Sequence, residues 1–269
     1  MNMISTGKTR AFFLALLTLS LLVTIQIAQA DGEPGYIWEI NFDFEDGLDG
    51  DLTIKMGPMV DGQIPAPIVE RHFPIACSSI GSVTLQNGSA IFDGTGYISC
   101  NLDLQSKIEQ TQAFCQTQPG AECPEAPEDS VQLHTIFGRA NANVAKYGFV
   151  PLFYHPDFKF WLNQDSINMS VNTTAGRMTA NANLGVTLNT FQNYTTMYEC
   201  TNEASPQCQS YLRSGNIVAL MGHTTNDLIQ FTLTQTPLYI GFNPDNGTYM
   251  KGEMGSLRVD PPAFGSHGD

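Results

Sequence analysis

The loop at 243–247, Asn-Pro-Asp-Asn-Gly, brings together residue types that could hold a ligand. Its carboxylate and amide oxygens suit a cation or a hydroxyl-rich ligand. The same residues also favour tight turns, because Asn, Asp and Gly tolerate the backbone conformations that turns require. An apolar run precedes the loop at 238–242, and a strand-like pattern follows at 254–259. The sequence therefore predicts a loop between two strands, which either carries the ligand site or is an ordinary turn.

Paired carboxyl groups are a second possible source of chemistry, since glycoside hydrolysis uses two of them about 5–9 Å apart. Glu39, Asp43 and Glu45 occupy odd-numbered positions in a stretch whose even-numbered positions are apolar. These acids can share one face of a strand, but that face should point to solvent. Glu253 has no evident partner in the sequence. We therefore lean towards no catalysis and keep a carbohydrate-active hydrolase or lyase as the alternative.

Metal-ligand and nucleophile motifs are absent from the sequence, which has no HExxH and no GxSxG pattern. Asp46, Asp49 and Asp51 are spaced as in a calcium loop but lack its closing glutamate, so we interpret them as a solvated turn. His155 and His223 are interpreted as ordinary loop histidines.

Aromatic side chains could stack on sugar rings. Trp161 is the most interesting, because it falls on the polar side of an alternating run at 158–163. Such a tryptophan is either exposed for binding or covered by a loop. Tyr249 and Asn246, which lie in or beside the 243–247 loop, complete the predicted ligand-binding residues.

Residues 1–30 have the pattern of a secretory signal peptide. Lys8 and Arg10 precede an apolar segment at 11–27, and Ala28-Gln29-Ala30 is a small-x-small cleavage site. The alternative is an uncleaved membrane anchor. The chain has a formal net charge of −14, which disfavours binding to nucleic acid or to anionic lipid. We expect a secreted, extracellular protein without membrane contact after cleavage.

Six cysteines in an exported chain indicate disulfides. Two pairs flank polar loops with the same spacing, and the third pair brackets an expected hairpin. We expect three local bonds, Cys115–Cys123, Cys200–Cys208 and Cys77–Cys100, although about 15 connectivities are possible for six cysteines.

Asn-x-Ser/Thr sequons occur at Asn87, Asn168, Asn172, Asn193 and Asn246. In a eukaryote, several of these asparagines would carry glycans and lie at the surface. In a bacterium they would follow from an Asn- and Thr-rich composition.

Short alternating strands separated by turn residues dominate the pattern, and long helical periodicity is absent. Asn87-Gly88 joins strands at 83–86 and 89–92, and this dipeptide is a strong hairpin signal. A second hairpin is expected around 164–166. The fold class is therefore all-β, with a two-sheet antiparallel sandwich.

One domain is expected at 31–260, followed by a disordered tail at 261–269. Within it, 45–67 reads as loop with at most a short strand. The segments at 103–130 and 172–215 read as surface insertions, the first with a short helix near 104–114.

Three segments together resemble the concanavalin A-like lectin and glucanase superfamily, in particular its laminin G-like and pentraxin-like domains. Residues 42–47 are similar to their opening strand, 89–98 to an early strand pair, and 237–259 to their closing strands. The resemblance spans roughly 36–260. It implies a two-sheet jelly roll that binds glycans or matrix proteins, often with calcium.

The resemblance also implies a set of calcium ligands. Residues just after the Ile-Gly of the closing strands ligate calcium in pentraxin-like members, and Asn243 and Asp245 hold the matching positions. An earlier acidic loop matches Asn141 and Asn143 here, where the expected acids are missing. Only one of the four is a carboxylate, so any calcium affinity should be weak.

The resulting hypothesis is a secreted, disulfide-bonded lectin-like module that recognises a glycan or an extracellular matrix protein, with calcium as a weakly bound cofactor. Besides the enzyme, a second alternative is a structural subunit of an extracellular assembly. An exposed aromatic side chain beside the 243–247 loop favours the lectin. A groove lined by paired carboxyls favours the enzyme, and a flat apolar patch favours the assembly subunit.

Overall fold

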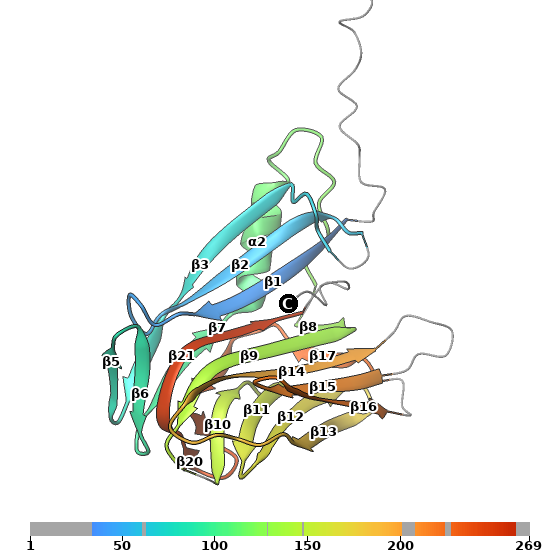
Figure 1. The fold of residues 1–269 in the computed structure, drawn as a ribbon. Helices are drawn as coiled ribbons and strands as arrows, with labels where there is room; N and C mark the ends of the chain where they lie inside the picture. Colours follow the sequence, from blue (N-terminus) through green and yellow to red (C-terminus); the bar gives the residue numbers. More distant parts are fainter. Residues whose placement is uncertain are drawn as a thin grey trace, which may run out of the picture. The chain divides into compact units, whose positions relative to one another are not determined.

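Two large antiparallel sheets are built from the alternating segments (Figure 1). The computed structural model describes residues 34–60, 63–127, 129–146, 148–200, 208–223 and 227–261. The predicted signal peptide at 1–30 and residues 262–269 of the predicted tail lie outside these ranges. No helix in the described part of the chain has the length and apolarity needed to cross a membrane.

The larger sheet has ten strands, with the order β16-β15-β14-β9-β21-β1-β2-β3 and with β6 and β5 attached beside β21. Their bounds are β1 (Pro34–Phe42), β2 (Gly50–Pro58), β3 (Val69–Ile75), β5 (Val83–Gln86), β6 (Ser89–Asp93), β9 (Thr135–Val144), β14 (Phe191–Cys200), β15 (Cys208–Ser214), β16 (Ile217–His223) and β21 (Lys251–Asp260).

The smaller sheet has nine strands, with the order β4-β7-β18-β10-β11-β12-β17-β8 and with β13 beside β12. Their bounds are β4 (Cys77–Ile80), β7 (Tyr97–Leu102), β8 (Ser130–Leu133), β10 (Phe149–Tyr154), β11 (Phe158–Asn163), β12 (Ser166–Thr173), β13 (Gly176–Asn183), β17 (Ile229–Thr232) and β18 (Thr236–Ile240). A two-stranded hairpin, β19 (Phe242–Asn243) and β20 (Thr248–Tyr249), and one helix, α2 (Leu104–Cys115), complete the described elements.

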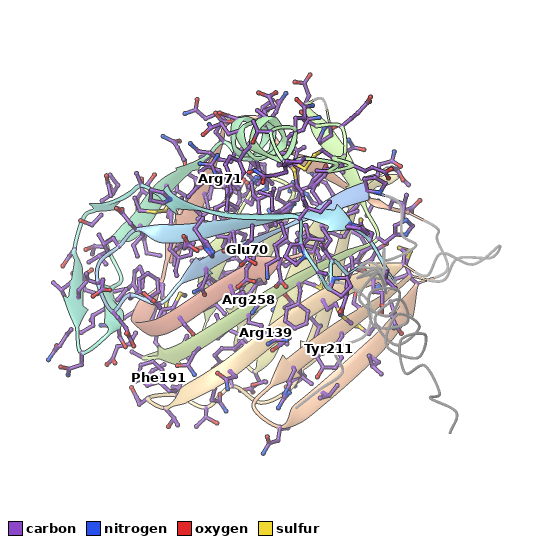
Figure 2. All side chains as sticks on the ribbon, turned by 90° about the horizontal axis from the view of Figure 1, so that it is seen from above. Glu70, Arg71, Arg139, Phe191, Tyr211 and Arg258 are labelled. Atoms are coloured by element: carbon purple, nitrogen blue, oxygen red, sulfur yellow. A yellow bond between two sulfur atoms is a disulfide. The ribbon has the colours of Figure 1, made fainter. Side chains whose placement is uncertain are left out.

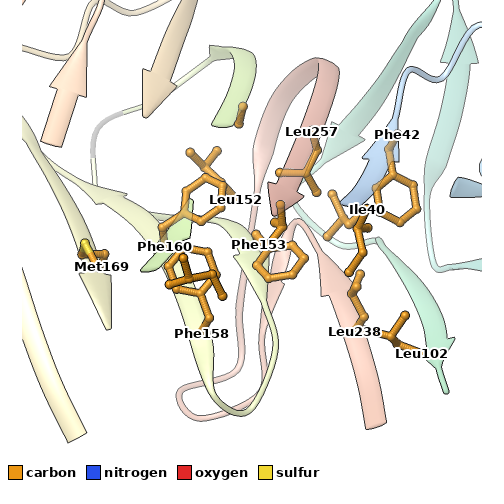
Figure 3. Close-up of a cluster of buried hydrophobic side chains, with 14 of the residues drawn as sticks. Ile40, Phe42, Leu102, Leu152, Phe153, Phe158, Phe160, Met169, Leu238 and Leu257 are labelled. Atoms are coloured by element: carbon orange, nitrogen blue, oxygen red, sulfur yellow. The ribbon is translucent and has the colours of Figure 1, made fainter. Parts of the chain in front are cut away.

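The hydrophobic core combines the inward faces of both sheets in one cluster. Figure 3 shows Ile40 and Leu257 from the larger sheet near Leu238 and Phe153 from the smaller one. Each such side chain contributes about 1.5–3 kcal/mol when it is fully buried. The predicted all-β, two-sheet antiparallel sandwich is confirmed by this arrangement.

Both predicted hairpins are present. Asn87 and Gly88 have φ values of 52° and 73°, as the turn between β5 and β6 requires. Gln164, with φ of 53°, lies in the turn that joins β11 and β12. Turn chemistry and alternation were therefore sufficient to locate these strand pairs.

Two segments differ from their predicted roles. β2 is a full strand that pairs with β1 and β3 inside the expected loop at 45–67, and its alternate residues Leu52, Ile54 and Met56 are buried. The expected insertion at 172–215 supplies β13, β14 and β15 to the two sheets. Its many Asn and Thr residues obscured the buried positions, which include Tyr194 and Leu212.

The segment at 103–130 contains the expected helix, which is also part of the core. α2 lies against β2 and β3 and buries Leu104, Ile108 and Cys115. The N-cap Asp103 accepts a hydrogen bond from the backbone N–H of Ser106 at 3.1 Å, which satisfies one free amide of the first turn. The helix is therefore part of the packed core and is not only a surface insertion.

All three predicted disulfides are present: Cys77–Cys100, Cys115–Cys123 and Cys200–Cys208. Two of them join paired residues of neighbouring strands, β4 with β7 and β14 with β15. Disulfides of this kind persist in oxidising compartments and stabilise a small domain by about 2–4 kcal/mol each.

The five sequons differ in access. Asn87, Asn193 and Asn246 are exposed. Asn168 is buried, and its amide nitrogen donates to Ser166. The amide nitrogen of Asn172 donates to Asp157 Oδ1 at 2.7 Å. Glycosylation stays a prediction, and the fold favours the three exposed sites for it.

His155 lies in the connection between β10 and β11, as interpreted, but it is fully buried and is not an ordinary surface histidine. Its ring stacks on Phe231 with centroids 4.5 Å apart, and its Nε2 lies 2.8 Å from Thr236 Oγ1. The backbone N–H of Asp157 donates to its Nδ1. Burial lowers the pKa of His155 from 6.5 to about 4, and the nearby Asp157 carboxylate only partly opposes this.

Acidification is therefore expected to destabilise the fold between about pH 6.5 and pH 4. In this window the unfolded chain protonates His155 and the folded chain does not, so stability is lost as pH falls, by up to about 3 kcal/mol. Urea unfolding at several pH values should show a steeper decline for the wild type than for His155→Gln, which retains a donor for Thr236. Equal declines would contradict this assignment.

Candidate ligand site

The outward face of β11, β12 and β13 is rich in amide and hydroxyl side chains. Strand register aligns Trp161, Asn168 and Asn181 in one row across β11, β12 and β13, and the next row holds Asn163, Ser166 and Asn183. Directly paired residues point to the same side of a sheet. We call this surface the polar face; its members are Lys159, Trp161, Asn163, Ser166, Asn168, Ser170, Asn172, Arg177, Thr179, Asn181 and Asn183.

Trp161 is partly buried and has a fixed neighbour. Its ring stacks on Phe149 of the adjacent strand β10, with centroids 5.5 Å apart and planes 19° from parallel. The other tryptophan, Trp38, is 2% exposed and packs against Phe231 in the core. Trp161 is therefore the tryptophan available at the surface, and a neighbouring strand rather than a loop supports it.

A line of partly buried aromatic rings continues from the polar face across β10, β18 and β7. The ring centroid of Tyr154 lies 5.9 Å from that of Tyr239, and the centroids of Tyr239 and Tyr97 are 5.6 Å apart. Tyr97 stacks on Phe242 at 4.5 Å, and Phe242 lies 4.8 Å from Tyr249. The predicted ligand residue Tyr249 thus belongs to an aromatic cluster beside the 243–247 loop, which we call the aromatic band.

Asp245 of this loop reaches over the polar face. One carboxylate oxygen pairs with the Lys159 ammonium, and the other accepts a hydrogen bond from the Tyr154 hydroxyl at 3.0 Å. Arg177 Nη1 lies 4.0 Å from the same carboxylate. Asn243 Oδ1 accepts from the Asp245 backbone N–H at 2.9 Å, which shapes the turn.

The electrostatics of this contact follow from the charges around it. The hydrogen bond from Lys159 lowers the pKa of the Asp245 carboxyl below its usual value. Burial, followed by the hydrogen bond to Asp245, raises the pKa of Tyr154 to about 12. The Tyr154 hydroxyl therefore remains a neutral donor at physiological pH.

The fourth residue of the turn, Asn246, caps it locally. Its Oδ1 accepts from the backbone N–H of Thr248 at 3.2 Å and from the Thr248 hydroxyl at 2.6 Å. Its oxygen is therefore engaged within the turn, and its role as a ligand-binding residue stays a prediction.

The four predicted calcium ligands lie in different elements: Asn243 ends β19, and Asp245 follows it in the turn before β20. Asn141 and Asn143 lie within β9 of the larger sheet, so the expected loop at this position is wrong. Asn141 Nδ2 donates to Asn193 Oδ1 at 2.7 Å, and Asp245 is already paired with Lys159. The described residues hold no group of three or more His, Cys, Asp or Glu side chains that could bind a metal ion. Calcium binding stays a prediction, and a cation at Asp245 would compete with the Lys159 ammonium.

The carboxyls considered for catalysis, Glu39 and Asp43, lie in different elements, a strand and the turn after it. Glu39 points outward from β1, whereas Asp43 accepts the backbone N–H of Glu45 in the following turn. Glu39 instead shares Arg258 with Asp260, each with an oxygen 3.1 Å from Arg258 Nη2. Burial raises the pKa of both carboxyls. The guanidinium lies between the two acids, so they form an ion-pair network and do not flank an open substrate position.

Lys159, Arg177 and Asp260 were not predicted as members of any site. Lys159 could have been found, because it lies on the polar side of the same alternation as Trp161. Arg177 depends on the pairing of β12 with β13, and Asp260 on that of β21 with β1, and no local sequence signal gives either.

No protein-family model and no curated protein matches this chain. Among solved structures, the carbohydrate-binding module CBM40 of Ruminococcus gnavus IT-sialidase is 11% identical, with a TM-score of 0.37, over 66% of this chain and 91% of that one. Domains LG4-5 of the mouse laminin alpha1 chain are 8% identical, with a TM-score of 0.36, over 86% and 80%. The binding domain of botulinum neurotoxin serotype C1 is 9% identical, with a TM-score of 0.34, over 69% of this chain and 42% of that domain.

Similarities at this level carry no argument about function. The sandwich assignment therefore rests on the strand pairing of this chain, and its function is argued from its own side chains.

Proposed function

We propose that this protein is an exported binding module that recognises a glycan on its polar face. The carrying observation is Trp161, which stacks on Phe149 of β10 at the edge of a surface of amides and hydroxyls. A sugar ring presents an apolar C–H face that packs on an aromatic ring, and hydroxyls that exchange hydrogen bonds with amides. Asn181 and Asn183 are exposed on β13, two strands from Trp161, and can serve hydroxyls of a ligand that extends across β12.

The position of the 243–247 loop supports the same proposal. An exposed aromatic side chain beside this loop was the feature expected of a lectin, and the aromatic rings found beside it are partly buried. Lys159, which binds Asp245 of the loop, lies two residues from Trp161 on the same face of β11. The aromatic band extends the stacking surface on the other side of Lys159 through Tyr154 and Tyr239.

Export is proposed from the disulfides together with the N-terminal sequence. Three disulfides suit an oxidising compartment. The signal-peptide pattern at 1–30 provides the route in this proposal.

A glycan-array screen of the exported protein, with calcium and with a chelator, tests the proposed function. We expect hits that persist in chelator and disappear in Trp161→Ala. Calcium-dependent hits would instead support the predicted ligands Asn243 and Asp245. Hits that Trp161→Ala leaves unchanged would place binding elsewhere, and a complete absence of hits would contradict the proposal.

Self-association through β16 is a second candidate function, in line with the alternative of an assembly subunit. β16 is the end strand of the larger sheet in the described residues, and Ile217, Val218 and Leu220 are 54%, 46% and 65% exposed. End strands offer unpaired backbone groups to another strand. The strand carries no acidic residue, so two copies of this acidic chain can approach here with little repulsion.

We expect Leu220→Glu to convert a dimer at tens of micromolar concentration into a monomer. A carboxylate at the centre of the strand places like charges opposite each other across a two-fold contact. Sedimentation velocity of both proteins measures this, with Leu85→Glu on the separate edge strand β5 as the control. A monomeric wild type would contradict this second candidate and leave glycan binding untouched.

A further inference from the structure

Lys159 is a cation held almost entirely beneath the surface of the polar face. Its side chain is 10% exposed, and its ammonium lies 5.2 Å from the centre of the Tyr154 ring. A buried charge requires a partner, because an unpaired charge in a poorly hydrated site is strongly destabilising. The partner here is Asp245.

That partner comes from a loop and not from the sheet that holds Lys159. Asp245 is 44% exposed and belongs to the turn between β19 and β20. The donors, in contrast, are anchored: Lys159 and Tyr154 lie on neighbouring strands. Arg177 is oriented by its hydrogen bonds to Asn172 Oδ1 at 3.0 Å and to the Pro156 carbonyl at 3.1 Å.

Two cationic groups and one phenolic hydroxyl thus converge on one carboxylate. Such a donor set is not specific to an aspartate, because ammonium and guanidinium groups bind carboxylate and sulfate oxygens in the same way. A movement of the loop tip would leave the donors in place and available to another anion. The chain as a whole has a net charge of −14, so a cationic centre on this face stands out.

The cationic centre lies close to Trp161, the aromatic side chain proposed to stack on the sugar. Lys159 and Trp161 are two residues apart on one face of a strand, which separates them by about 7 Å. Lys159 is therefore within reach of an acidic substituent on a sugar ring packed on Trp161.

From this geometry we infer that the glycan bound at the polar face is acidic, and that Asp245 occupies the position of its carboxylate or sulfate in the unliganded protein. This inference rests on the proposed glycan binding. Asp245 is then an internal competitor, which keeps Lys159 paired until a ligand displaces the loop.

The substitution Asp245→Asn tests the inference, because it removes the competing charge and nearly preserves shape. We expect it to raise affinity for an acidic glycan about 10-fold and to change affinity for a neutral one by less than about 2-fold. Calorimetric titrations would use oligogalacturonate against its methyl ester for the carboxylate, and dextran sulfate against dextran for the sulfate. The acidic probe whose affinity rises in Asp245→Asn, while that of its neutral counterpart does not, shows whether the recognised anion is a carboxylate or a sulfate.

The substitution Arg177→Gln tests the opposite effect, a loss of affinity for the acidic glycan. Arg177 is 46% exposed, so the variant should fold normally while losing affinity for the acidic probe by about 10-fold. Thermal unfolding of both variants separates binding effects from folding effects. Lys159→Met tests the same site without leaving a buried unpaired charge.

The outcomes also separate the two proposals. If neutral and acidic probes bind equally, Trp161→Ala removes both, and Asp245→Asn changes neither, then the glycan site stands and the acidic preference is overturned. If no glycan binds either the wild type or Asp245→Asn, both proposals are overturned.

Discussion

Replacing Gly252 with alanine is expected to reduce the free energy of unfolding by more than about 3 kcal/mol. Gly252 has φ of +148°, a conformation that residues with a side chain rarely adopt. A Cβ at this position would lie 2.1 Å from the backbone oxygen of Asn143. Both residues lie in adjacent central strands, β21 and β9, so the sheet cannot accommodate the methyl group without losing its pairing.

Gly185 is a matched control for this substitution. It also has a positive φ, +69°, but a Cβ there meets nothing within 4 Å. Gly185→Ala should therefore show only the backbone penalty, about 1–2 kcal/mol. Guanidinium unfolding of the two variants and the wild type measures the difference. Similar small losses for both would mean that β21 does not approach β9 as closely as described.

Replacing Trp161 with alanine should weaken glycan binding by roughly 30-fold or more, the effect of losing a central aromatic contact of about 2 kcal/mol. The substitution removes the stacking surface and exposes Phe149, but no buried charge or hydrogen bond is lost. The fold should survive with a modest decrease in melting temperature. Calorimetric titration with the strongest glycan from the array gives the affinity ratio.

The control for Trp161 lies on the other sheet. Tyr211 is partly buried on the outward face of the larger sheet (Figure 2), so Tyr211→Ala removes an aromatic ring from the sheet that does not carry the polar face. It should leave glycan affinity unchanged within about 2-fold. A larger effect of Tyr211→Ala than of Trp161→Ala would move the site to the larger sheet.

Local patterns were sufficient for many strands of both sheets. The alternation at 158–163 located β11 and its inward Phe158 and Phe160, and Asn87-Gly88 fixed the hairpin of β5 and β6. The three disulfides followed from spacing because each joins segments close in sequence. These features depend on neighbours along the chain, which a sequence displays directly.

Features that depend on distant segments were not predictable in this way. β2 was obscured by the Gly-, Asp- and Pro-rich residues at its ends, although its interior alternates. Asn141 and Asn143 look like a polar break, but β14 and β21 pair on either side of them and make them part of a central strand. Tertiary pairing decided the outcome at both places.

In the candidate site, too, local features were predictable from the sequence and long-range contacts were not. Trp161 was identified because its own strand alternates, and the 243–247 loop because of its turn residues. The pairing of Lys159 with Asp245 joins residues that are 86 positions apart, and Arg177 joins them only through the pairing of β12 with β13. The acidic preference proposed for the ligand depends on this long-range contact.

Nuclear magnetic resonance of the indole N–H groups tests the central claim most directly, because the chain has two tryptophans. Trp38 is buried in the core, and Trp161 lies on the polar face. Titration of nitrogen-15-labelled protein with a glycan from the array should shift the Trp161 indole signal and leave that of Trp38 in place. A glycan that binds while the Trp161 signal stays unchanged would contradict the assignment of the polar face as the binding site.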